Sequence, residues 1–228
     1  MFTFSLQKRL VAAALIGQFA IAGLASAQPA PFTQKPFTDV RTNHANYTAI
    51  EYLRTNNILR GYPDGTFRPD NSITRAEFVR LIVNPFIMDT ERLSNCVASE
   101  TNENSDNVFF TDVQKDDWFA NEVCLAHVTD LIDGYADNTF KPNHYINFAE
   151  AAKIISNVFA FNRSTEDQPT TEWFKPYVEK LAELKAIPTT ITRMDKEITR
   201  GEMVEMVYRV KADNTKKASM TYAGIKRY

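Results

Sequence analysis

The strongest constraint on the fold is an internal repeat. Three motifs from the first part of the chain return later in the same order, with the same offset and no gap. They are Phe37-Thr38-Asp39-Val40, repeated at 110–113, Gly61-Tyr62, repeated at 134–135, and Ile73-Thr74-Arg75-Ala76-Glu77, repeated with substitutions at 146–150. A third, looser copy keeps Trp173-Phe174 and Ile198-Thr199-Arg200-Gly201-Glu202. Repeated units of this kind bury their cores partly against one another, so we expect function at equivalent positions of the copies or between them.

Each copy follows the pattern helix, turn, helix. Apolar residues recur at helical spacing on both sides of a segment rich in turn formers. In the first copy the second helix is expected to stop before Pro85. In its turn Gly61 and Gly65 suit positive φ, and Asn138 replaces Gly65 in the second copy. The fold is therefore predicted to be mainly α, with helices at 47–57, 75–84, 118–130, 148–159, 173–185 and 200–210.

Composition divides the chain into successive segments. The Pro-rich and Asn/Ser/Glu-rich stretches separate the copies from their surroundings, and the last segment is basic and either frayed or docked. The predicted order is a signal peptide at 1–27, an extended leader at 28–36, copy one at 37–90, a connector at 91–109, copy two at 110–165, a degenerate copy three at 166–210 and a tail at 211–228.

The amino terminus has the form of a secretory signal. Lys8 and Arg9 precede the apolar stretch 10–24, and Ala25-Ser26-Ala27 is a small-residue cleavage site. A transmembrane anchor is the alternative, but the stretch is interrupted by Gln18 and is shorter than the roughly 20 apolar residues that span a bilayer. No later segment is apolar enough to cross, so we expect an exported protein of the cell envelope or cell surface. The net charge of −2 argues against nucleic acid as a partner.

The two cysteines, Cys96 and Cys124, suit one disulfide in an exported protein. Their pairing would tie the end of copy one to the first helix of copy two, with a stabilisation on the order of 3 kcal/mol in the chain-entropy model. The alternative is two separate buried thiols. The cysteines and the scattered His44, His127 and His144 show no ligand spacing, so we expect neither a metal site nor a cofactor.

The start of each second helix carries a capping box. In this motif the N-cap side chain accepts a hydrogen bond from the backbone three residues on, and a Glu at that position reaches back to the N-cap amide. We therefore interpret three pairs as structural, namely Thr74 with Glu77, Asn147 with Glu150, and Thr199 with Glu202.

Arg75 and Arg200 stand at the first position of their helices, where the helix dipole disfavours a cation. A guanidinium beside free helix-start amides can bind a carboxylate or phosphate. A solvated arginine paired with a nearby acid, such as Asp70 beside Arg75, is the equally weighted alternative. In copy two the position is Phe148, which cannot hold an anion in this way.

Trp118 and Trp173 stand at the start of the first helices of copies two and three, and Ala45 is the aligned residue of copy one. A tryptophan at such a place is more often a buried core residue than a ligand platform. We therefore favour the core interpretation and keep stacking on a sugar ring as the alternative.

Together these motifs resemble the surface-layer homology (SLH) domain of bacterial cell-envelope proteins. The shared features are Phe-x-Asp-Val, a Trp-led helix, Gly-Tyr-Pro-Asp-Gly-Thr-Phe-Arg-Pro and Ile-Thr-Arg-Ala-Glu, and they cover about 37–210 as three tandem copies. The resemblance implies a mainly α fold of three helix-loop-helix repeats in a pseudo-threefold bundle. It also implies non-covalent attachment to secondary cell-wall polysaccharide, often with pyruvate ketals on its sugars, in grooves between neighbouring copies.

Carried over position by position, the resemblance supplies the candidate ligand-binding residues. They are the arginines Arg75 and Arg200, the early acids Asp39 and Asp112, the aromatic residues Trp118 and Trp173, and the turn glycines Gly61 and Gly134. Phe148 removes the arginine of copy two, Ala45 removes the tryptophan of copy one, and copy three lacks the early Asp and the Gly-Tyr pair. At most two of the three grooves between copies therefore keep a full set of the ligand-binding residues that the resemblance implies.

Two other functions compete with cell-wall anchoring. The array could be a structural scaffold that binds another envelope protein, perhaps through its basic tail. It could also be an enzyme, since a glycosidase needs only two carboxylates across a cleft. However, the five candidate carboxylates each have a turn or cap explanation, and no Ser/His/Asp or Cys/His grouping is present in the sequence. The five are Asp64, Asp70, Glu77, Asp137 and Glu150. We therefore expect a non-catalytic protein that binds an acidic polysaccharide.

Overall fold

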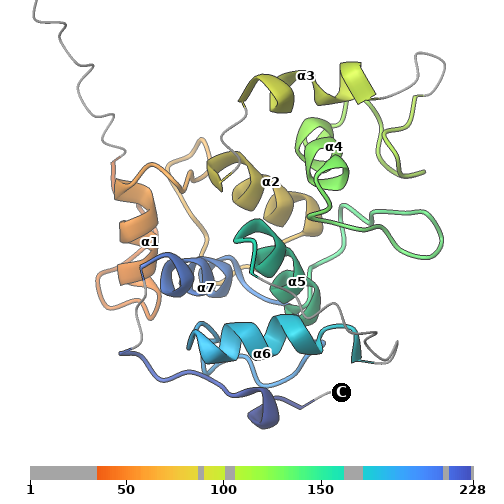
Figure 1. Cartoon of the computed structure of the whole chain (residues 1–228). Helices are drawn as coiled ribbons and strands as arrows, with labels where there is room; N and C mark the ends of the chain where they lie inside the picture. Colours follow the sequence, from red (N-terminus) through yellow and green to blue (C-terminus); the bar gives the residue numbers. More distant parts are fainter. Residues whose placement is uncertain (1–34, 87–89, 101–105, 162–171, 213–215, 227–228) are drawn as a thin grey trace, which may run out of the picture. The chain divides into compact units, whose positions relative to one another are not determined.

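The structure is a computed structural model and describes residues 35–86, 90–100, 106–161, 172–212 and 216–226. The predicted signal peptide, most of the leader and the junction between copies two and three lie outside these residues. The described residues are mainly helical, as predicted, and their extended segments form isolated bridges instead of named strands (Figure 1). The elements are α1 (Tyr47–Thr55), α2 (Arg75–Phe86), α3 (Thr90–Glu100), α4 (Ala120–Val128), α5 (Phe148–Val158), α6 (Lys175–Glu183), α7 (Arg200–Lys211) and the 3-10 helix η2 (Tyr222–Gly224).

A ring of backbone hydrogen bonds joins the three copies just before their second helices. Ile73 N donates to Ile198 O at 3.2 Å, Ile198 N donates to Ile146 O at 3.1 Å, and Ile146 N donates to Ile73 O at 3.0 Å. All three isoleucines are fully buried. Since each residue both donates to one copy and accepts from the other, the three copies meet around a pseudo-threefold axis.

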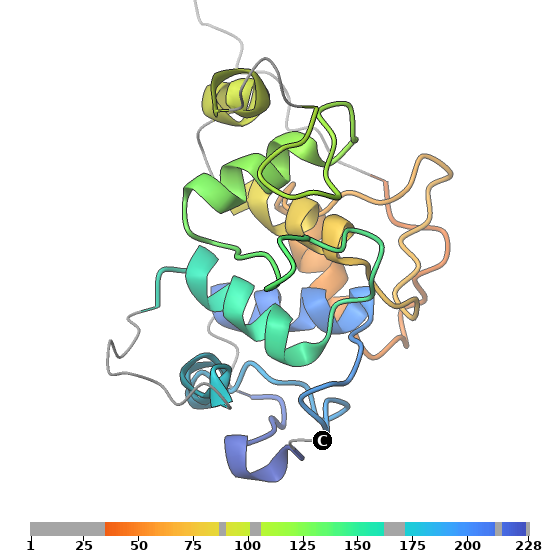
Figure 2. The same cartoon turned by 90° about the vertical axis from the view of Figure 1, so that its right-hand side faces the viewer.

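The helices interlock around this axis. The first helix of each copy packs on the second helix of the copy before it, so α4 lies against α2, α6 against α5, and α1 against α7 (Figures 1 and 2). The last pair joins copy one to copy three and closes the ring. Each copy therefore covers the apolar face of another, and the core is shared by all three.

Helix α3 lies in the segment that composition marked only as a connector. It packs on α4, and Cys96 of α3 forms the predicted disulfide with Cys124 of α4, with the two Cα atoms 6.0 Å apart. Both half-cystines are fully buried, and Leu93 and Val97 rest on the core beside them. Leu93, Cys96 and Val97 stand at helical spacing, and the covalent link to α4 holds them against the core.

Several positions with a special backbone conformation build the turns of copies one and two, among them Arg68 and Lys141, both with φ of 58°. Gly65 and Asn138 have φ of 80° and 58°, which agrees with the predicted left-handed position. Gly61 is different, because it does not have the positive φ that we expected. A Cβ atom on Gly61 would lie 2.4 Å from Phe37 Cε1 and 2.4 Å from Thr66 O, so this glycine is required for space.

The end of α2 also differs from the prediction. The helix continues through Pro85 to Phe86 instead of stopping before the proline. The ring of Phe86 packs on Phe159 of copy two with the centroids 5.0 Å apart, and this contact holds the last turn. None of the helices in the described ranges is long and apolar enough to pass through a bilayer.

The tail is docked on copy three. Lys226 N donates to Thr192 O at 2.9 Å, Met194 N donates to Lys226 O at 2.9 Å, and Ile225 is buried. In copy one the opening segment makes a comparable contact with its turn, where Thr38 N donates to Gly65 O at 3.0 Å. The tail thus packs on the turn of copy three as the opening segment packs on the turn of copy one.

Candidate functional site

A candidate site is a groove of about 650 Å³ to which all three copies contribute side chains. We call it the first groove and define it by Gly61, Tyr62, Glu77 and Arg80 of copy one, Trp118 of copy two and Arg200 of copy three. Three of the predicted ligand-binding residues, Gly61, Trp118 and Arg200, therefore meet in one cavity.

Arg200 forms the inner wall of this groove and is 3% exposed. Its Nε donates to Phe67 O at 2.8 Å, and its guanidinium carbon lies 4.6 Å from the ring centroid of Tyr62. Glu77 is a distant ion-pair partner, with Oε1 3.8 Å from Arg200 NH1. Burial lowers the pKa of Arg200 from its usual value. The side chain thus fixes copy three to the turn of copy one while it faces the groove.

Tyr62 and Glu77 line the groove beside this arginine. The Tyr62 hydroxyl donates to Glu77 Oε1 at 2.9 Å, and burial raises the pKa of the tyrosine. The other oxygen of Glu77 accepts from Thr74 N at 3.1 Å, as expected of a capping box. Glu77 therefore joins the helix start, the turn and the groove wall.

Trp118 lies at the mouth of the groove with 53% of its surface exposed. The guanidinium carbon of Arg80 is 5.1 Å from the centroid of its ring, and Arg80 Nε is 3.5 Å from Glu122 Oε1. Trp173 is also exposed, at 40%. The favoured core interpretation of the two tryptophans is therefore wrong, because each ring stands at the surface where two copies meet.

Copies two and three repeat this arrangement around Arg75, which is 4% exposed. Arg75 Nε donates to Phe140 O at 2.8 Å, the guanidinium carbon is 4.8 Å from the Tyr135 centroid, and Arg75 NH1 is 3.4 Å from Glu150 Oε2. Burial raises the pKa of Tyr135. At the surface Lys153 Nζ lies 5.8 Å from the Trp173 ring. We call the residues of this arrangement the second set.

The proposed pairing of Arg75 with Asp70 does not occur. Asp70 instead accepts a hydrogen bond from His44 Nε2 at 3.2 Å. The pairing was an alternative because the two residues are close in the sequence. In the structure Arg75 instead points into copy two, where the Phe140 carbonyl, the Glu150 carboxylate and two aromatic rings surround its buried guanidinium.

Asp39 and Asp112 are not brought to the first groove. Asp39 accepts from Phe67 N at 2.8 Å and from Arg68 N at 2.6 Å. Asp112 makes the same pair of contacts with Phe140 N and Lys141 N, at 2.7 and 2.8 Å. Both carboxylates hold the end of a turn. Gly134 also has a structural role, because a Cβ atom at this position would lie 2.4 Å from Phe110 Cε1.

The capping residues are placed as the motif predicts. Asn147 with Glu150 and Thr199 with Glu202 form complete capping boxes at the starts of α5 and α7. In copy one Glu77 N donates to Thr74 Oγ1 at 3.3 Å. These contacts place the residue after each N-cap at the junction of two copies, which is how Arg75, Phe148 and Arg200 reach equivalent positions.

Another groove, of about 450 Å³, lies between copy three, copy one and the tail. We call it the third groove, because it takes the place of the first groove and the second set at the third junction between copies. Its wall includes His44, Asn46, Thr190, Glu205, Arg209 and Lys217. Ala45 stands where the other arrangements have tryptophan. Phe148, which replaces the motif arginine, is fully buried.

Sequence reasoning missed the cations that accompany the two tryptophans. Arg80 and Lys153 each stand five positions after the first residue of a motif helix. This register was visible in the repeat, but both residues also fit the solvent-facing side of a helix. Only the packing of one copy on the next shows that this side meets a tryptophan.

Comparison with known proteins identifies the repeat. The family model of the S-layer homology domain matches residues 36–79 and 109–152, which hold the turn and the motif helix start of copies one and two. Two segments of the chain are therefore similar to the S-layer homology domain. The third copy lies outside both matches, although its backbone completes the ring through Ile198.

Several cell-surface proteins are similar to the chain. It is 28% identical over 158 residues to the "Middle cell wall protein" of Brevibacillus brevis, which covers 69% of the chain and 14% of the relative. It is 32% identical over 133 residues to the "Cellulosome-anchoring protein" of Acetivibrio thermocellus, which covers 58% of the chain and 26% of the relative. An "Amylopullulanase" of Thermoanaerobacterium thermosulfurigenes is 26% identical over 188 residues, or 76% of the chain and 9% of the relative.

The chain thus corresponds to a small part of each of these relatives. The S-layer homology domains and the cell-surface relatives support an exported protein of the cell envelope, as the sequence predicted. The S-layer homology domain is itself a non-catalytic anchoring domain.

Proposed function

We propose that this protein anchors to the cell wall by binding an acidic polysaccharide in the first groove, without catalysis. The observation that carries the proposal is the meeting of Trp118, Arg80 and Arg200 from three different copies around one cavity of about 650 Å³. The S-layer homology domains and the printed name of the cellulosome-anchoring relative support the same role.

The chemistry of the groove suits an acidic sugar. Trp118 offers an exposed aromatic face for the apolar side of a sugar ring. The cation–π contact between this ring and the Arg80 guanidinium places a positive charge beside that face. Arg200 supplies a second guanidinium at the inner wall, where low solvent access strengthens its attraction for an anion. A carboxylate on a sugar, such as a pyruvate ketal, fits between the two cations by charge.

The second set offers a related but weaker arrangement. Trp173 and Lys153 repeat the aromatic residue and the accompanying cation, with Arg75 behind them. The lysine lies 5.8 Å from the ring, compared with 5.1 Å for the Arg80 guanidinium carbon over Trp118. A lysine also lacks the planar fork with which arginine binds a carboxylate. We therefore assign the main binding role to the first groove.

The test is retention on purified cell-wall sacculi before and after extraction of the wall polysaccharide. Wild-type protein should be retained only on unextracted sacculi, and Trp118→Ala and Arg80→Gln should each reduce retention at least several-fold. Tyr145→Ala and Arg41→Gln are matched controls, because Tyr145 is 52% exposed, Arg41 is exposed, and neither lines the first groove. Equal retention on extracted sacculi would instead favour a protein partner in the envelope.

A further inference from the structure

The third groove reverses the charge found at the equivalent place of the other two arrangements. Five residues after the first residue of each motif helix stand Arg80, Lys153 and Glu205. The first two are cations beside an exposed tryptophan. Glu205 is a carboxylate that is 1% exposed and that lines the third groove. The charge at this position of the motif helix is therefore opposite in copy three.

The two oxygens of Glu205 share Lys217 and otherwise have different partners. Oε1 accepts a hydrogen bond from Arg209 Nε at 2.8 Å. The NH1 group of the same arginine donates to Ala218 O at 2.9 Å and to Lys185 O at 3.3 Å. Oε2 accepts from Lys217 Nζ at 3.0 Å and, at the long distance of 3.5 Å, from Asn46 Nδ2. A buried carboxylate oxygen without a good donor is costly. Within the described residues, the second oxygen thus depends mainly on an ammonium group.

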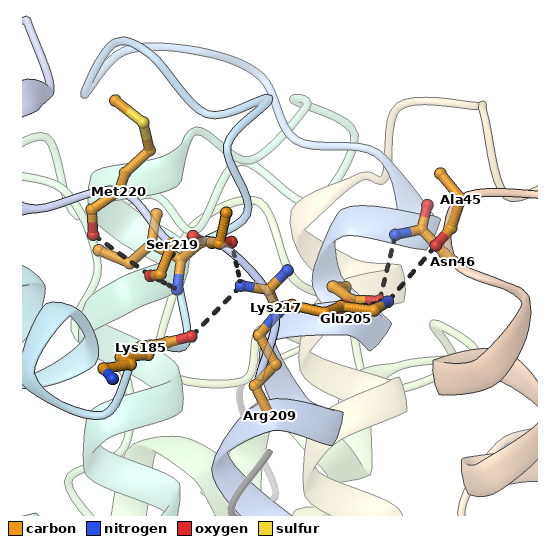
Figure 3. Close-up of polar contacts among 10 residues, drawn as sticks. Ala45, Asn46, Lys185, Glu205, Arg209, Lys217, Ser219 and Met220 are labelled. Atoms are coloured by element: carbon orange, nitrogen blue, oxygen red, sulfur yellow. Dashed lines mark hydrogen bonds and ion pairs between the residues drawn. The ribbon is translucent and has the colours of Figure 1, made fainter. Parts of the chain in front are cut away.

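Lys217 provides this ammonium from the tail (Figure 3). Its Nζ lies 2.8 Å from Glu205 Oε1, 3.0 Å from Glu205 Oε2 and 3.5 Å from Ala45 O. These three acceptors match the three N–H donors of an alkylammonium ion. They come from α7 of copy three and from the segment just before α1 of copy one, so the two copies together form the receptor.

Lys217 reaches a buried carboxylate from a partly exposed position. The Lys217 side chain is 35% exposed, whereas the Glu205 side chain is 2% exposed. The neighbouring tail residues are held elsewhere, where Ser219 Oγ donates to Ile187 O at 3.0 Å and Met220 N donates to the same carbonyl at 3.0 Å. The tail is thus also docked by contacts that do not involve the ammonium group.

The other charged groups of this cavity agree with a cationic occupant. Glu202 on the same wall is already paired with Lys196 at 2.6 Å, and Asp70 at the edge is 3.2 Å from His44. Arg209 turns its donors toward Glu205 and two backbone carbonyls. The carboxylate of Glu205 is thus the acidic group that faces the position of the ammonium.

We propose that the third groove is a binding site for a primary ammonium group and that Lys217 is its intramolecular occupant. A ligand that carries a free alkylamine on a flexible chain competes with Lys217 for Glu205 and Ala45 O. An acidic sugar is disfavoured here, because Glu205 stands where the first groove has Arg80. This site depends on neither the polysaccharide nor the tryptophans, so it can be tested separately from the proposed function.

The test is chemical rescue of Lys217→Ala in the full chain. Ethylammonium chloride should raise the thermal unfolding midpoint of this variant more than tetraethylammonium chloride at the same concentration, since only the primary ion has three donors. Wild type should show a smaller difference between the salts, because its own lysine occupies the site. The double variant Glu205→Gln/Lys217→Ala should show no difference between them.

An equal response of Lys217→Ala to the two salts would overturn the proposal, as would the same selective response in the double variant. If Lys217→Ala does not fold without additive, recovery of the folded circular dichroism spectrum in ethylammonium alone supports the site. Failure to recover in either salt counts against it.

Discussion

Arg200 Nε donates a 2.8 Å hydrogen bond to the backbone carbonyl of Phe67, which joins copy three to the turn of copy one. Arg75 makes the same 2.8 Å bond to Phe140 of copy two. The arginine of the motif is thus a link between copies as well as a cation that faces a groove. A loss of binding after its removal therefore has to be separated from a loss of stability.

Arg200→Ala is expected to lower the free energy of unfolding by about 2–4 kcal/mol, because it removes a buried charge-assisted hydrogen bond and leaves Phe67 O without that donor. Denaturant unfolding of the variant and of Arg80→Gln measures this directly. Arg80, whose side chain is 48% exposed, should change stability by less than about 1 kcal/mol. A neutral effect of Arg200→Ala on stability would show that the link is not structural.

Gly61→Ala is expected to destabilise the protein by about 1–3 kcal/mol, because the new Cβ would meet the Phe37 ring and Thr66 O at 2.4 Å. Thermal unfolding compares it with Gly224→Ala, whose Cβ would meet its nearest neighbour at 3.3 Å. We expect a clear drop in the midpoint for the first variant and little change for the second. Similar midpoints for both would contradict the close approach.

Removal of the disulfide should loosen α3. The variant with Cys96→Ser and Cys124→Ser should lose on the order of 3 kcal/mol of stability in the chain-entropy model. Amide hydrogen exchange should then increase most within Thr90–Glu100, because α3 has few other buried residues. Unchanged exchange in α3 would mean that packing alone holds this helix.

Ile225→Ala should destabilise copy three by about 2–4 kcal/mol, since Ile225 is 4% exposed and packs on the core. Lys226→Ala is the control, because it removes an exposed side chain and keeps the backbone bonds to Thr192 and Met194. Urea unfolding distinguishes the two variants. Equal stability would show that the tail contributes nothing to copy three.

Acid should weaken the turn of copy one through Asp64. Hydrogen bonds from the Thr66 side chain and backbone, followed by Arg68, lower the pKa of Asp64 to about 2. A depressed pKa stabilises the fold above the unfolded value, near 3.8, and this contribution is lost as the pH falls toward 2. The difference in melting midpoint between wild type and Asp64→Asn should thus be constant above about pH 5 and shrink between about pH 4 and 2. A pH-independent difference would contradict the shift.

The sequence predicted the helices of the repeat well because their signals are local. The capping boxes, the Pro and Gly positions of the turns, and apolar periods fix where α2, α5 and α7 begin, and the first helices were found to within a few residues. Helix α3 was missed although Leu93, Cys96 and Val97 stand at helical spacing, because the polar composition of the segment indicated a connector. The choice between a frayed and a docked tail also required the structure.

The candidate site was predicted less completely, because its geometry is tertiary. The sequence marked Trp118 and Arg200 but could not show that the ring would be exposed and the arginine buried. Asp39 does not line the groove that holds Trp118 and Arg200. Its carboxylate instead accepts hydrogen bonds from the amides of Phe67 and Arg68. Arg80 was visible only as one more charged residue on a helix until copy two was placed against it.

The contact of α1 with α7 has a consequence for how such proteins can change. A row of repeats that stack end to end can gain a unit at either end, because each end offers a free face. Here the first and last units cover each other, so no face is left for a fourth. We expect duplication of the gene segment to add a second, separate ring of three repeats on the same chain. We expect deletion of one repeat to expose apolar surface on both of the repeats that it covered.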